Sequence, residues 1–302
     1  MKAPRLMALA LSCVTALGIL AGCSGSAAKA GSITIGSKDF TESIVLGELV
    51  AQYVEKNSDI KVTRKLNLGG TTVNFDGIKK GDLDLYVEYD GTGYGVHLKH
   101  TDPITNPDAI YDQVKKEFEE KYKLTFTKPF GFNNTYALAM PKTVAEQYGI
   151  KTYSDLAKHS DKLVFATTNE FMGREADGFE PLAKTYGYHF KDVKKMQTGL
   201  RYKAIEQNEA QVMDAYATDG KLAEFGMVLL QDDKKFFPPY NGAPLVRMET
   251  LEKNPGLKDL LDKLGGQIKD GEMQQLNYRV EVKAEPVEKV VEEFLKSKGL
   301  VK

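Results

Sequence analysis

The sequence predicts an α/β protein built from two lobes. From residue 32 onward, short β-like runs alternate with helical runs in a β-α-β-α-β order, which is typical of a domain around a largely parallel sheet. The same order starts again after the segment "LTFTKPFGFNNTYALAMPK". Two helical stretches then close the chain, so the second α/β run is expected to be inserted within a discontinuous first lobe.

The elements of the first run follow from periodicity and from start signals. Strands are expected where apolar residues recur in short runs, at 32–37, 61–70 and 83–89. Helices are expected after capping residues or a proline, over 42–56 with Thr41 as N-cap, from Thr71 or Thr72 to Lys80, and over 107–122 from Pro107. The first helix has an apolar face formed by Ile44, Leu46, Val50, Tyr53 and Val54.

The second run repeats these signals and leads into the tail. Its expected elements are helices at 142–149 and 153–159, a strand at 162–168, a helix at 173–187 and the segments 211–220 and 227–233. The Pro- and Gly-rich segment "KKFFPPYNGAPLVRM" is expected to cross back to the first lobe. The two closing helices are expected at 249–266 and 285–298.

The first 22 residues have the pattern of a secretory signal peptide. Lys2 and Arg5 form a positive start, and the apolar run after them is short for a membrane span. The run ends in "LAGC", which resembles a bacterial lipobox and would make Cys23 the lipidated residue. Residues 23–32 are then a flexible tether, and the protein is expected on the extracytoplasmic face of the cell membrane. Plain secretion with a chance cysteine is the alternative.

The composition of the mature chain excludes several function classes. The only other cysteine, Cys13, lies in the signal peptide, so a cysteine nucleophile, a cysteine-ligated zinc site and a disulfide scaffold are excluded. The formal net charge is −1, with 41 basic and 42 acidic residues intermixed, so no basic block suggests nucleic acid. The chain has 15 Tyr and 14 Phe but no Trp, so aromatic recognition depends on tyrosine and phenylalanine.

Catalytic and metal-binding motifs are missing from the sequence. The four histidines are His97, His100, His159 and His189, and none is in an HExxH or other metal-ligand spacing, although His97 and His100 sit three apart. They are expected to be solvated on the surface, and a metal site is the alternative. The turn "GTGYG" follows a strand as a dinucleotide loop would, but it lacks the third glycine and a good helix after it. No catalytic residue, metal or cofactor is therefore expected.

The stretch "LYVEYDGTGYGV" leaves the role of its tyrosines open. Alternation places Tyr89 on the apolar face of its strand and Tyr86, Glu88 and Asp90 on a polar face. An ordinary core position is one interpretation of Tyr89. A ligand contact is the other, because Tyr89 ends a parallel strand at the carboxyl edge where open α/β sheets bind ligands.

Five segments in chain order resemble the osmoprotectant-binding proteins of ABC importers, which bind glycine betaine, carnitine or choline. They are "GSKDFTESIVLGEL", "DLYVEYDGTG", "NNTYALAM", "DAYATDGKL" and "PPYNGAPLVR". The resemblance runs from about residue 33 to 300. It implies a type II periplasmic-binding-protein fold, with two α/β lobes joined by two crossover segments that close on ligand. The lobes would be 33–135 plus 240–302, and 136–239.

The resemblance also implies a set of ligand-binding residues: Lys38, Tyr89, Thr92, Tyr136, Arg174, Tyr216 and Tyr240. The four tyrosines would form a cage around a quaternary ammonium group. The two cations would grip a ligand carboxylate from opposite lobes, and the threonine would reach the same end. Asp90 stands where the family more often has threonine, which leaves its effect on selectivity open. Three further aromatic residues are expected to pack beside the site, namely Tyr86, Tyr94 and Phe132.

The chemistry of the residues agrees with this assignment. A trimethylammonium group has no N–H, so aromatic faces select it, at roughly 0.5–2 kcal/mol per ring. Two cations near the cage favour a zwitterion such as glycine betaine or carnitine and penalise choline. The sequence thus predicts a monomeric, non-enzymatic solute-binding protein that delivers a quaternary-ammonium osmolyte to a membrane permease. The alternatives are a binder of a different zwitterion or cation, and an extracytoplasmic enzyme on the same two-lobe scaffold.

Overall fold

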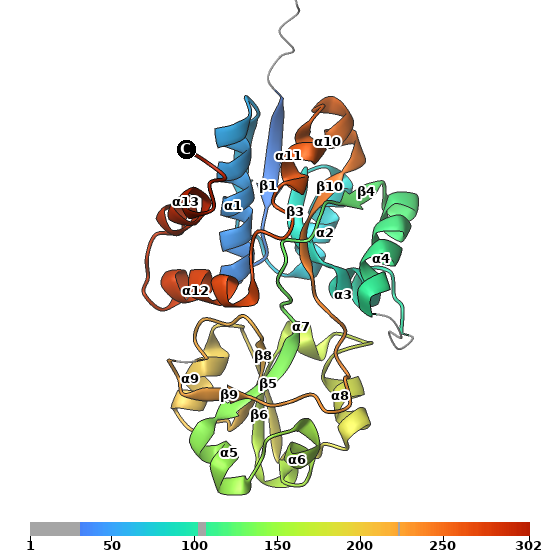
Figure 1. Cartoon of the computed structure of the whole chain (residues 1–302). Coiled ribbons are helices and arrows are strands. Elements are labelled where there is room, and N and C mark those ends of the chain that lie inside the picture. The colour runs from blue at the N-terminus through green and yellow to red at the C-terminus, as the bar shows by residue number, and fades with distance from the viewer. Residues whose placement is uncertain (1–30, 102–106, 223) are drawn as a thin grey trace, which may run out of the picture.

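The computed structural model describes residues 31–101, 107–222 and 224–302. Two lobes are stacked on one another, and two chain segments pass between them (Figure 1). The predicted signal peptide, Cys23 and all but the last two residues of the predicted tether lie outside the described residues. Within the described ranges, none of the helices combines the length and the apolar character that crossing a membrane requires.

The first lobe contains a mixed five-stranded sheet in the order β2-β1-β3-β10-β4. Its strands are β1 (Ser32–Gly36), β2 (Lys61–Lys65), β3 (Leu85–Tyr89), β4 (Leu124–Phe126) and β10 (Gly242–Arg247). β1 pairs in parallel with β2 and β3, whereas β10 is antiparallel to β3 and β4. The expected sheet was largely parallel. β10 differs because it returns from the second lobe and therefore enters the sheet from the opposite end.

The second lobe repeats this plan in the order β7-β6-β8-β5-β9. Its strands are β5 (Tyr136–Pro141), β6 (Val164–Thr168), β7 (Asp192–Met196), β8 (Val212–Tyr216) and β9 (Met227–Leu229). β6 is parallel to β7 and β8, and β5 is antiparallel to β8 and β9. The predicted two-lobe fold with two crossovers is confirmed. The lobe boundaries at 135/136 and 239/240 lie between the two sheets and stay predictions.

Helices flank both sheets (Figure 1). Those of the first lobe are α1 (Thr41–Asn57), α2 (Thr71–Lys80), α3 (Asp90–Thr92), the π-helical turn η1 (Gly93–His97), α4 (Pro107–Tyr122), α10 (Met248–Lys253), α11 (Leu257–Asp262), α12 (Asp270–Glu281) and α13 (Val287–Ser297). Those of the second lobe are α5 (Lys142–Tyr148), α6 (Tyr153–Ala157), the 3₁₀ turn η2 (Ser160–Lys162), α7 (Asn169–Met172), α8 (Phe179–Tyr186) and α9 (Leu200–Glu206).

Start signals located the first helices of the chain well. α2 begins at Thr71 and α4 at Pro107, as predicted. α1 begins one residue earlier than expected, because Thr41 is already helical and Phe40 takes the N-cap position without a side-chain hydrogen bond. The turn after β3 also differs from the expectation, because the helical turns α3 and η1 follow the strand at once.

The tail of the chain is less regular than predicted. The helix expected over 249–266 is split into α10 and α11, because Gly256 adopts a left-handed conformation with φ 87°. α12 was missed altogether. Of its twelve residues only Met273, Leu276 and Asn277 are buried, so its apolar periodicity is weak. It lies beside α1 at the end of the first lobe that faces the second (Figure 1).

Both faces of strand β3 are buried, which corrects the predicted polar face. Leu85, Val87 and Tyr89 belong to the cluster that includes α1, as the alternation predicts. Tyr86 instead packs with α2 and α4 on the other face and is fully buried. Glu88 on the same face is also fully buried, so its carboxylate must be satisfied inside the protein.

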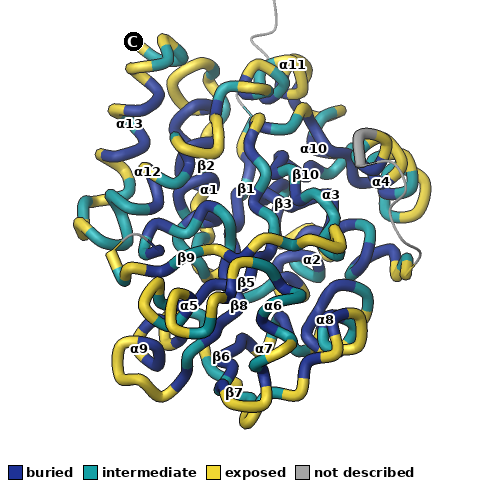
Figure 2. Tube along the Cα trace, turned by 60° about the horizontal axis from the view of Figure 1, so that its bottom comes forward, coloured by how far each residue is buried: buried dark blue, intermediate teal, exposed yellow. Residues whose placement is uncertain are grey.

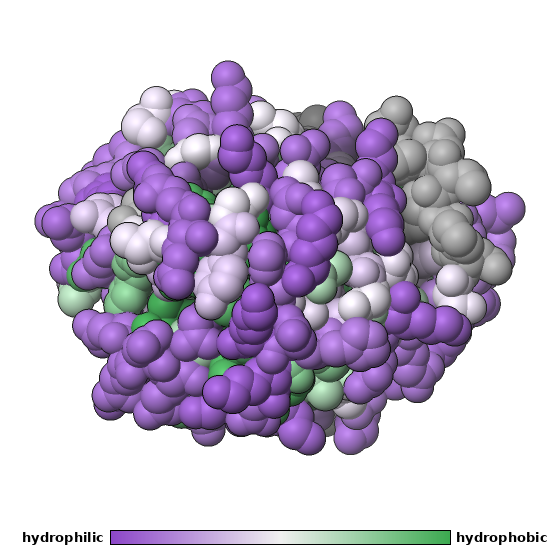
Figure 3. Space-filling model, turned by 90° about the horizontal axis from the view of Figure 1, so that it is seen from below, coloured by the Kyte–Doolittle hydropathy of each residue, from purple (hydrophilic) through white to green (hydrophobic). Residues whose placement is uncertain are grey.

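The burial pattern places the core around the strands of each lobe. Buried residues follow the strands and the inner faces of the helices, and exposed residues follow the outer turns (Figure 2). The face seen in Figure 3 is mainly hydrophilic, with apolar residues in separate patches. Leu229 of β9, in the second lobe, is one of four large apolar residues that the described chain exposes.

The two crossover segments, 127–135 and 230–241, are tied to each other and to the end of β3. Asn133 and Asn241 form an antiparallel bridge, and the backbone N–H of Tyr240 donates to Oδ1 of Asn133 at 2.8 Å. The carboxylate of Asp90 accepts from the backbone and side-chain N–H of Asn241, both at 2.7 Å. Burial raises the pKa of Asp90 to about 6.

Gly91 is predicted to be required for this junction. A Cβ at this position would lie 2.5 Å from the carbonyl oxygen of Pro239 and 2.8 Å from the ring of Tyr240. Gly91→Ala is expected to lower the unfolding free energy by about 1–3 kcal/mol, because backbone must move. The matched control is Gly271→Ala in α12, where no atom lies within 4 Å and alanine favours the helix. Urea unfolding of both variants checks this, and equal stability would contradict it.

Candidate ligand-binding site

A cavity lies between the two lobes. Its empty volume is about 490 Å³, including the part that is open to solvent. All seven residues that the sequence assigns to the ligand line this one cavity. The complete lining is Lys38, Asp39, Phe40, Gly70, Thr71, Tyr89, Thr92, Asn134, Tyr136, Glu170, Arg174, Thr198, Tyr216 and Tyr240. Contact between these side chains and a ligand stays a prediction.

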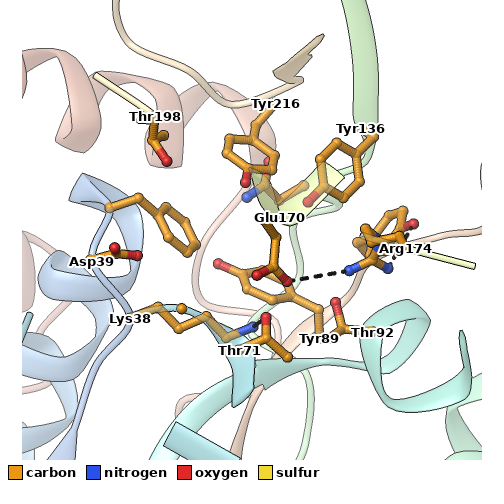
Figure 4. A pocket seen from close by; sticks show the side chains of 14 residues that line it. Lys38, Asp39, Thr71, Tyr89, Thr92, Tyr136, Glu170, Arg174, Thr198 and Tyr216 are labelled. Carbon is orange, nitrogen blue, oxygen red and sulfur yellow. Dashed lines mark hydrogen bonds and ion pairs between the residues drawn. The ribbon is translucent and has the colours of Figure 1, made fainter. Parts of the chain in front are cut away.

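The strand ends of both sheets position the lining. Lys38 follows β1, Tyr89 ends β3 and Tyr216 ends β8, so all three lie at carboxyl edges of parallel strands. Tyr136 begins β5 and is the register partner of Tyr216. Tyr240 lies in the second crossover. The cavity therefore receives side chains from both lobes and from the segments that join them (Figure 4).

The aromatic rings of the cavity form one connected group. The ring centroids of Tyr136 and Tyr216 are 5.0 Å apart, and those of Tyr136 and Tyr240 are 5.5 Å apart. Phe40 links the two lobes, with its centroid 5.4 Å from that of Tyr216 and 6.5 Å from that of Tyr89. Phe40 was not predicted, although it stands in the "GSKDF" segment that contains Lys38.

Arg174 lies in a turn and not in the predicted helix 173–187. Gly178 makes the turn tight, since a Cβ there would lie 2.3 Å from the carbonyl oxygen of Phe171, and α8 begins only after it. Arg174 is 4% exposed, and its guanidinium binds Asp177 in a bidentate pair, with both N–O distances at 2.6 Å. It also lies over the rings of Tyr136 and Tyr240, at 5.1 and 5.5 Å from the centroids.

Lys38 is also paired with a carboxylate. Its ammonium lies 2.5 Å from Oε1 of Glu88 and donates to the hydroxyl of Thr71 at 3.1 Å. Glu88 further accepts from Tyr86 and contacts Nε2 of His97 at 3.1 Å. Burial opposes the charge on Glu88, but the nearby Lys38 and His97 outweigh it and lower its pKa to about 2. His97 is therefore buried at a carboxylate, not solvated as expected.

These two ion pairs correct the prediction that both cations of the site are free to attract a ligand carboxylate. Lys38 and Arg174 were counted as free cations that favour a carboxylate ligand and penalise choline. Each has its own buried carboxylate, in Glu88 and Asp177. The charge of the cations is therefore largely compensated before any ligand enters. Their remaining N–H groups still offer hydrogen bonds to a carboxylate.

Glu42, at the start of α1, is the main residue that the sequence did not single out. It is buried behind Tyr89, whose hydroxyl donates to Oε1 at 2.7 Å. Oε1 also accepts from the side-chain amide of Asn134 at 2.7 Å. Oε2 accepts from the hydroxyl of Thr218 and from the amide of Asn277 at 3.0 Å. The four donors come from β3, the first crossover, the second lobe and α12.

The environment of Glu42 changes its titration. Burial raises the pKa of its carboxyl to about 7, against the opposing effect of the hydrogen bonds from Thr218, Tyr89 and Asn277. No signal in the sequence marks this residue, because its four partners are brought together only by the fold. Within the described residues, no cluster of three or more His, Cys, Asp or Glu side chains could hold a metal ion.

Comparison with known proteins supports a common family. Residues 31–297 match the OpuAC family, described as the substrate binding domain of ABC-type glycine betaine transport systems. The carnitine transport binding protein OpuCC of Listeria monocytogenes is 37% identical over 264 residues, which cover 87% of this chain and 85% of that protein. The glycine-betaine-binding protein of Pseudomonas aeruginosa is 36% identical over 301 residues, covering 96% and 94%.

The chain is also similar to a further relative and to a solved structure. The ergothioneine transport permease/ergothioneine binding protein EgtU of Helicobacter pylori (strain G27) is 37% identical over 269 residues. The match covers 89% of this chain, which spans about half, 48%, of that relative. A crystal structure described as a glycine betaine/carnitine/choline ABC transporter superposes with a TM-score of 0.74 at 35% identity, covering 90% of this chain and 99% of that one.

Glu42 is predicted to make the stability of the protein depend on pH. Its pKa is raised from 4.5 to about 7, so between these values the folded state holds a proton that the unfolded chain releases. This stabilisation is complete below about pH 4.5 and is lost as the pH rises through 7. The unfolding free energy of the native protein is therefore expected to fall by at most about 3 kcal/mol across this window. Glu42→Gln cannot titrate, so this decrease is expected to be absent from the variant.

Urea unfolding of the native protein and of Glu42→Gln between pH 4.5 and 8 measures this effect. Asp90 and Asp219 also have raised pKa values, both about 6, but they titrate in both proteins, so Glu42 is the titrating group that differs between the two profiles. Parallel pH profiles of the two proteins would contradict the raised pKa of Glu42.

Proposed function

The chain belongs to the family of substrate-binding domains of ABC-type glycine betaine transport systems, and we propose that it captures a quaternary-ammonium osmolyte in the cavity between its lobes. Its relatives are named as binding proteins of transporters, so the enzyme alternative is not favoured. The observation that carries the proposal is the shared cavity, where aromatic rings from both lobes surround a space bordered by two buried cations.

The aromatic rings suit the ammonium end of such a ligand. Tyr89 and Phe40 belong to the first lobe, and Tyr136 and Tyr216 belong to the second. A methylated ammonium between these rings gains roughly 0.5–2 kcal/mol from each face. The rings of Tyr136 and Tyr240 already border the guanidinium of Arg174. Cations also lie near the other two tyrosines, with Lys38 5.4 Å from the centroid of Tyr89 and Arg201 5.6 Å from that of Tyr216. The ligand ammonium must therefore use the ring faces that these cations leave open.

The two paired cations suit the carboxylate end. Nη1 of Arg174 makes no hydrogen bond within the described residues, since Nε and Nη2 carry the contacts to Asp177 and Tyr240. Lys38 uses two of its three ammonium hydrogens on Glu88 and Thr71. Hydrogen bonds from these N–H groups would orient glycine betaine or carnitine. Choline is penalised less than the sequence predicted, because both positive charges are compensated.

Closure of the lobes would couple binding to transport. A ligand that contacts rings and cations of both lobes stabilises the closed arrangement more than an open one. The closed protein would then deliver the ligand to a permease driven by an ATPase. We also propose that Cys23 carries the lipid that holds the protein, as a monomer, at the extracytoplasmic face of the membrane.

A calorimetric panel tests the proposed ligand class. Glycine betaine and carnitine are expected to bind the purified protein more tightly than choline, and glycine is expected not to bind measurably because it lacks the methylated ammonium. Ergothioneine belongs in the panel because it is also a trimethylammonium zwitterion. The proposal fails if none of the methylated compounds binds, or if the protein converts one of them chemically.

Tyr216 tests the cage directly. Tyr216→Ala is expected to lose at least about 1 kcal/mol of binding free energy, because one aromatic face is removed. Tyr216→Phe keeps the face and serves as the control, with an affinity close to that of the native protein. Calorimetry with the ligand that binds most tightly in the panel gives both values. An unchanged affinity of Tyr216→Ala would remove this residue from the cage.

A further inference from the structure

One side chain in the cavity has no role in the function proposed so far. Glu170 is the second residue of α7 in the second lobe, and Figure 4 shows its side chain directed into the cavity among the labelled residues. Its Oε1 lies 3.9 Å from Nη1 of Arg174. A Cβ placed on Gly70 of the first lobe would lie 3.1 Å from its Oε2, so the carboxylate reaches across to the opposite wall.

Glu170 differs from the other carboxylates around the site in its hydrogen bonds. Glu42, Glu88 and Asp177 each accept several hydrogen bonds from buried donors. Within the part of the chain that the structure describes, Glu170 accepts no hydrogen bond, and its ion pair with Arg174 is 3.9 Å long. Its side chain is 34% exposed, so solvent in the cavity reaches it. Its acceptor capacity is therefore open to a ligand.

The pairing of charges in the site also leaves the carboxylate of Glu170 available to a ligand. Lys38 is neutralised by Glu88, and Arg174 is neutralised by Asp177. The charged residues of the lining that remain are Asp39 and Glu170. Asp39 is exposed, whereas Glu170 lies between the walls of the cavity. Glu170 is therefore the carboxylate within the cavity that has only a long ion pair, at 3.9 Å from Arg174.

We propose that Glu170 is a specificity-determining residue, which accepts a hydrogen bond from a hydroxyl or N–H group of the ligand. A quaternary nitrogen has no hydrogen to donate, so the donor must lie elsewhere in the molecule. Among ligands that carry both the methylated ammonium and a carboxylate, the site then prefers those with such a donor over those that lack one. Charge-assisted hydrogen bonds in a partly desolvated site give this discrimination. The inference rests on the proposed function and deepens it.

The test compares two ligands that differ by one hydroxyl group. Carnitine and γ-butyrobetaine have the same charges and chain length, but only carnitine carries a hydroxyl. The native protein is expected to bind carnitine about tenfold or more tightly, the range of one hydrogen bond to a charged acceptor. Glu170→Met keeps the length of the side chain and removes the acceptor, so the ratio of the two Kd values is expected to fall to within about threefold.

Asp39→Asn is the matched control, because it removes one negative charge from the same lining. It is expected to change both affinities together and to leave their ratio as in the native protein. A ratio near one in the native protein, or a native ratio retained in Glu170→Met, would overturn the inference. The second result would mean that Glu170 does not accept the hydrogen bond of the carnitine hydroxyl. If neither compound binds but glycine betaine does, the inference is also overturned, because the site then does not favour the ligand with a donor. If no compound of the calorimetric panel binds, the proposed function itself fails.

Discussion

The carboxylate of Glu42 accepts hydrogen bonds from both lobes, from the first crossover and from α12, and the arrangement of the site depends on this contact. A carboxylate that is removed from water is unfavourable unless donors replace its hydration. Here four side chains from separate segments donate hydrogen bonds in place of water, namely Tyr89, Asn134, Thr218 and Asn277. Any change in the relative position of the lobes must therefore alter the environment of Glu42. Because Tyr89 is one of the donors, the same contact holds one wall of the cavity.

The two buried cations of the cavity also have partners that replace their hydration. Buried ion pairs contribute little net stability, since desolvation offsets much of their attraction. They do hold Lys38 and Arg174 in defined positions, so that their remaining N–H groups are oriented before a ligand arrives. Glu88 connects the pair at Lys38 to His97 and Tyr86 below the cavity. Glu170 points into the cavity, has only the 3.9 Å ion pair with Arg174 and accepts no hydrogen bond from the described residues, which is why selectivity is assigned to it.

The sequence predicted the two-lobe architecture and half of the residues that line the cavity, but not the electrostatics of the cavity. Periodicity and start signals located α2 and α4, because these helices begin at a threonine and a proline with apolar residues spaced behind them. The family resemblance supplied seven residues that all line one cavity. Phe40, Glu42 and Glu170 were missed. Their functions depend on neighbours that are distant in the chain, and no local spacing signals such neighbours.

The sequence by itself determined the order of the elements, the two-lobe plan, the family and the residue types available for recognition. These properties follow from local patterns and from motifs, which are contained in short stretches of chain. Only the tertiary structure decided which charges are paired, that the second face of β3 is buried and that Glu42 joins both lobes. Burial and pairing depend on which distant segments meet, because a charge inside a protein requires partners that the surrounding fold must bring to it.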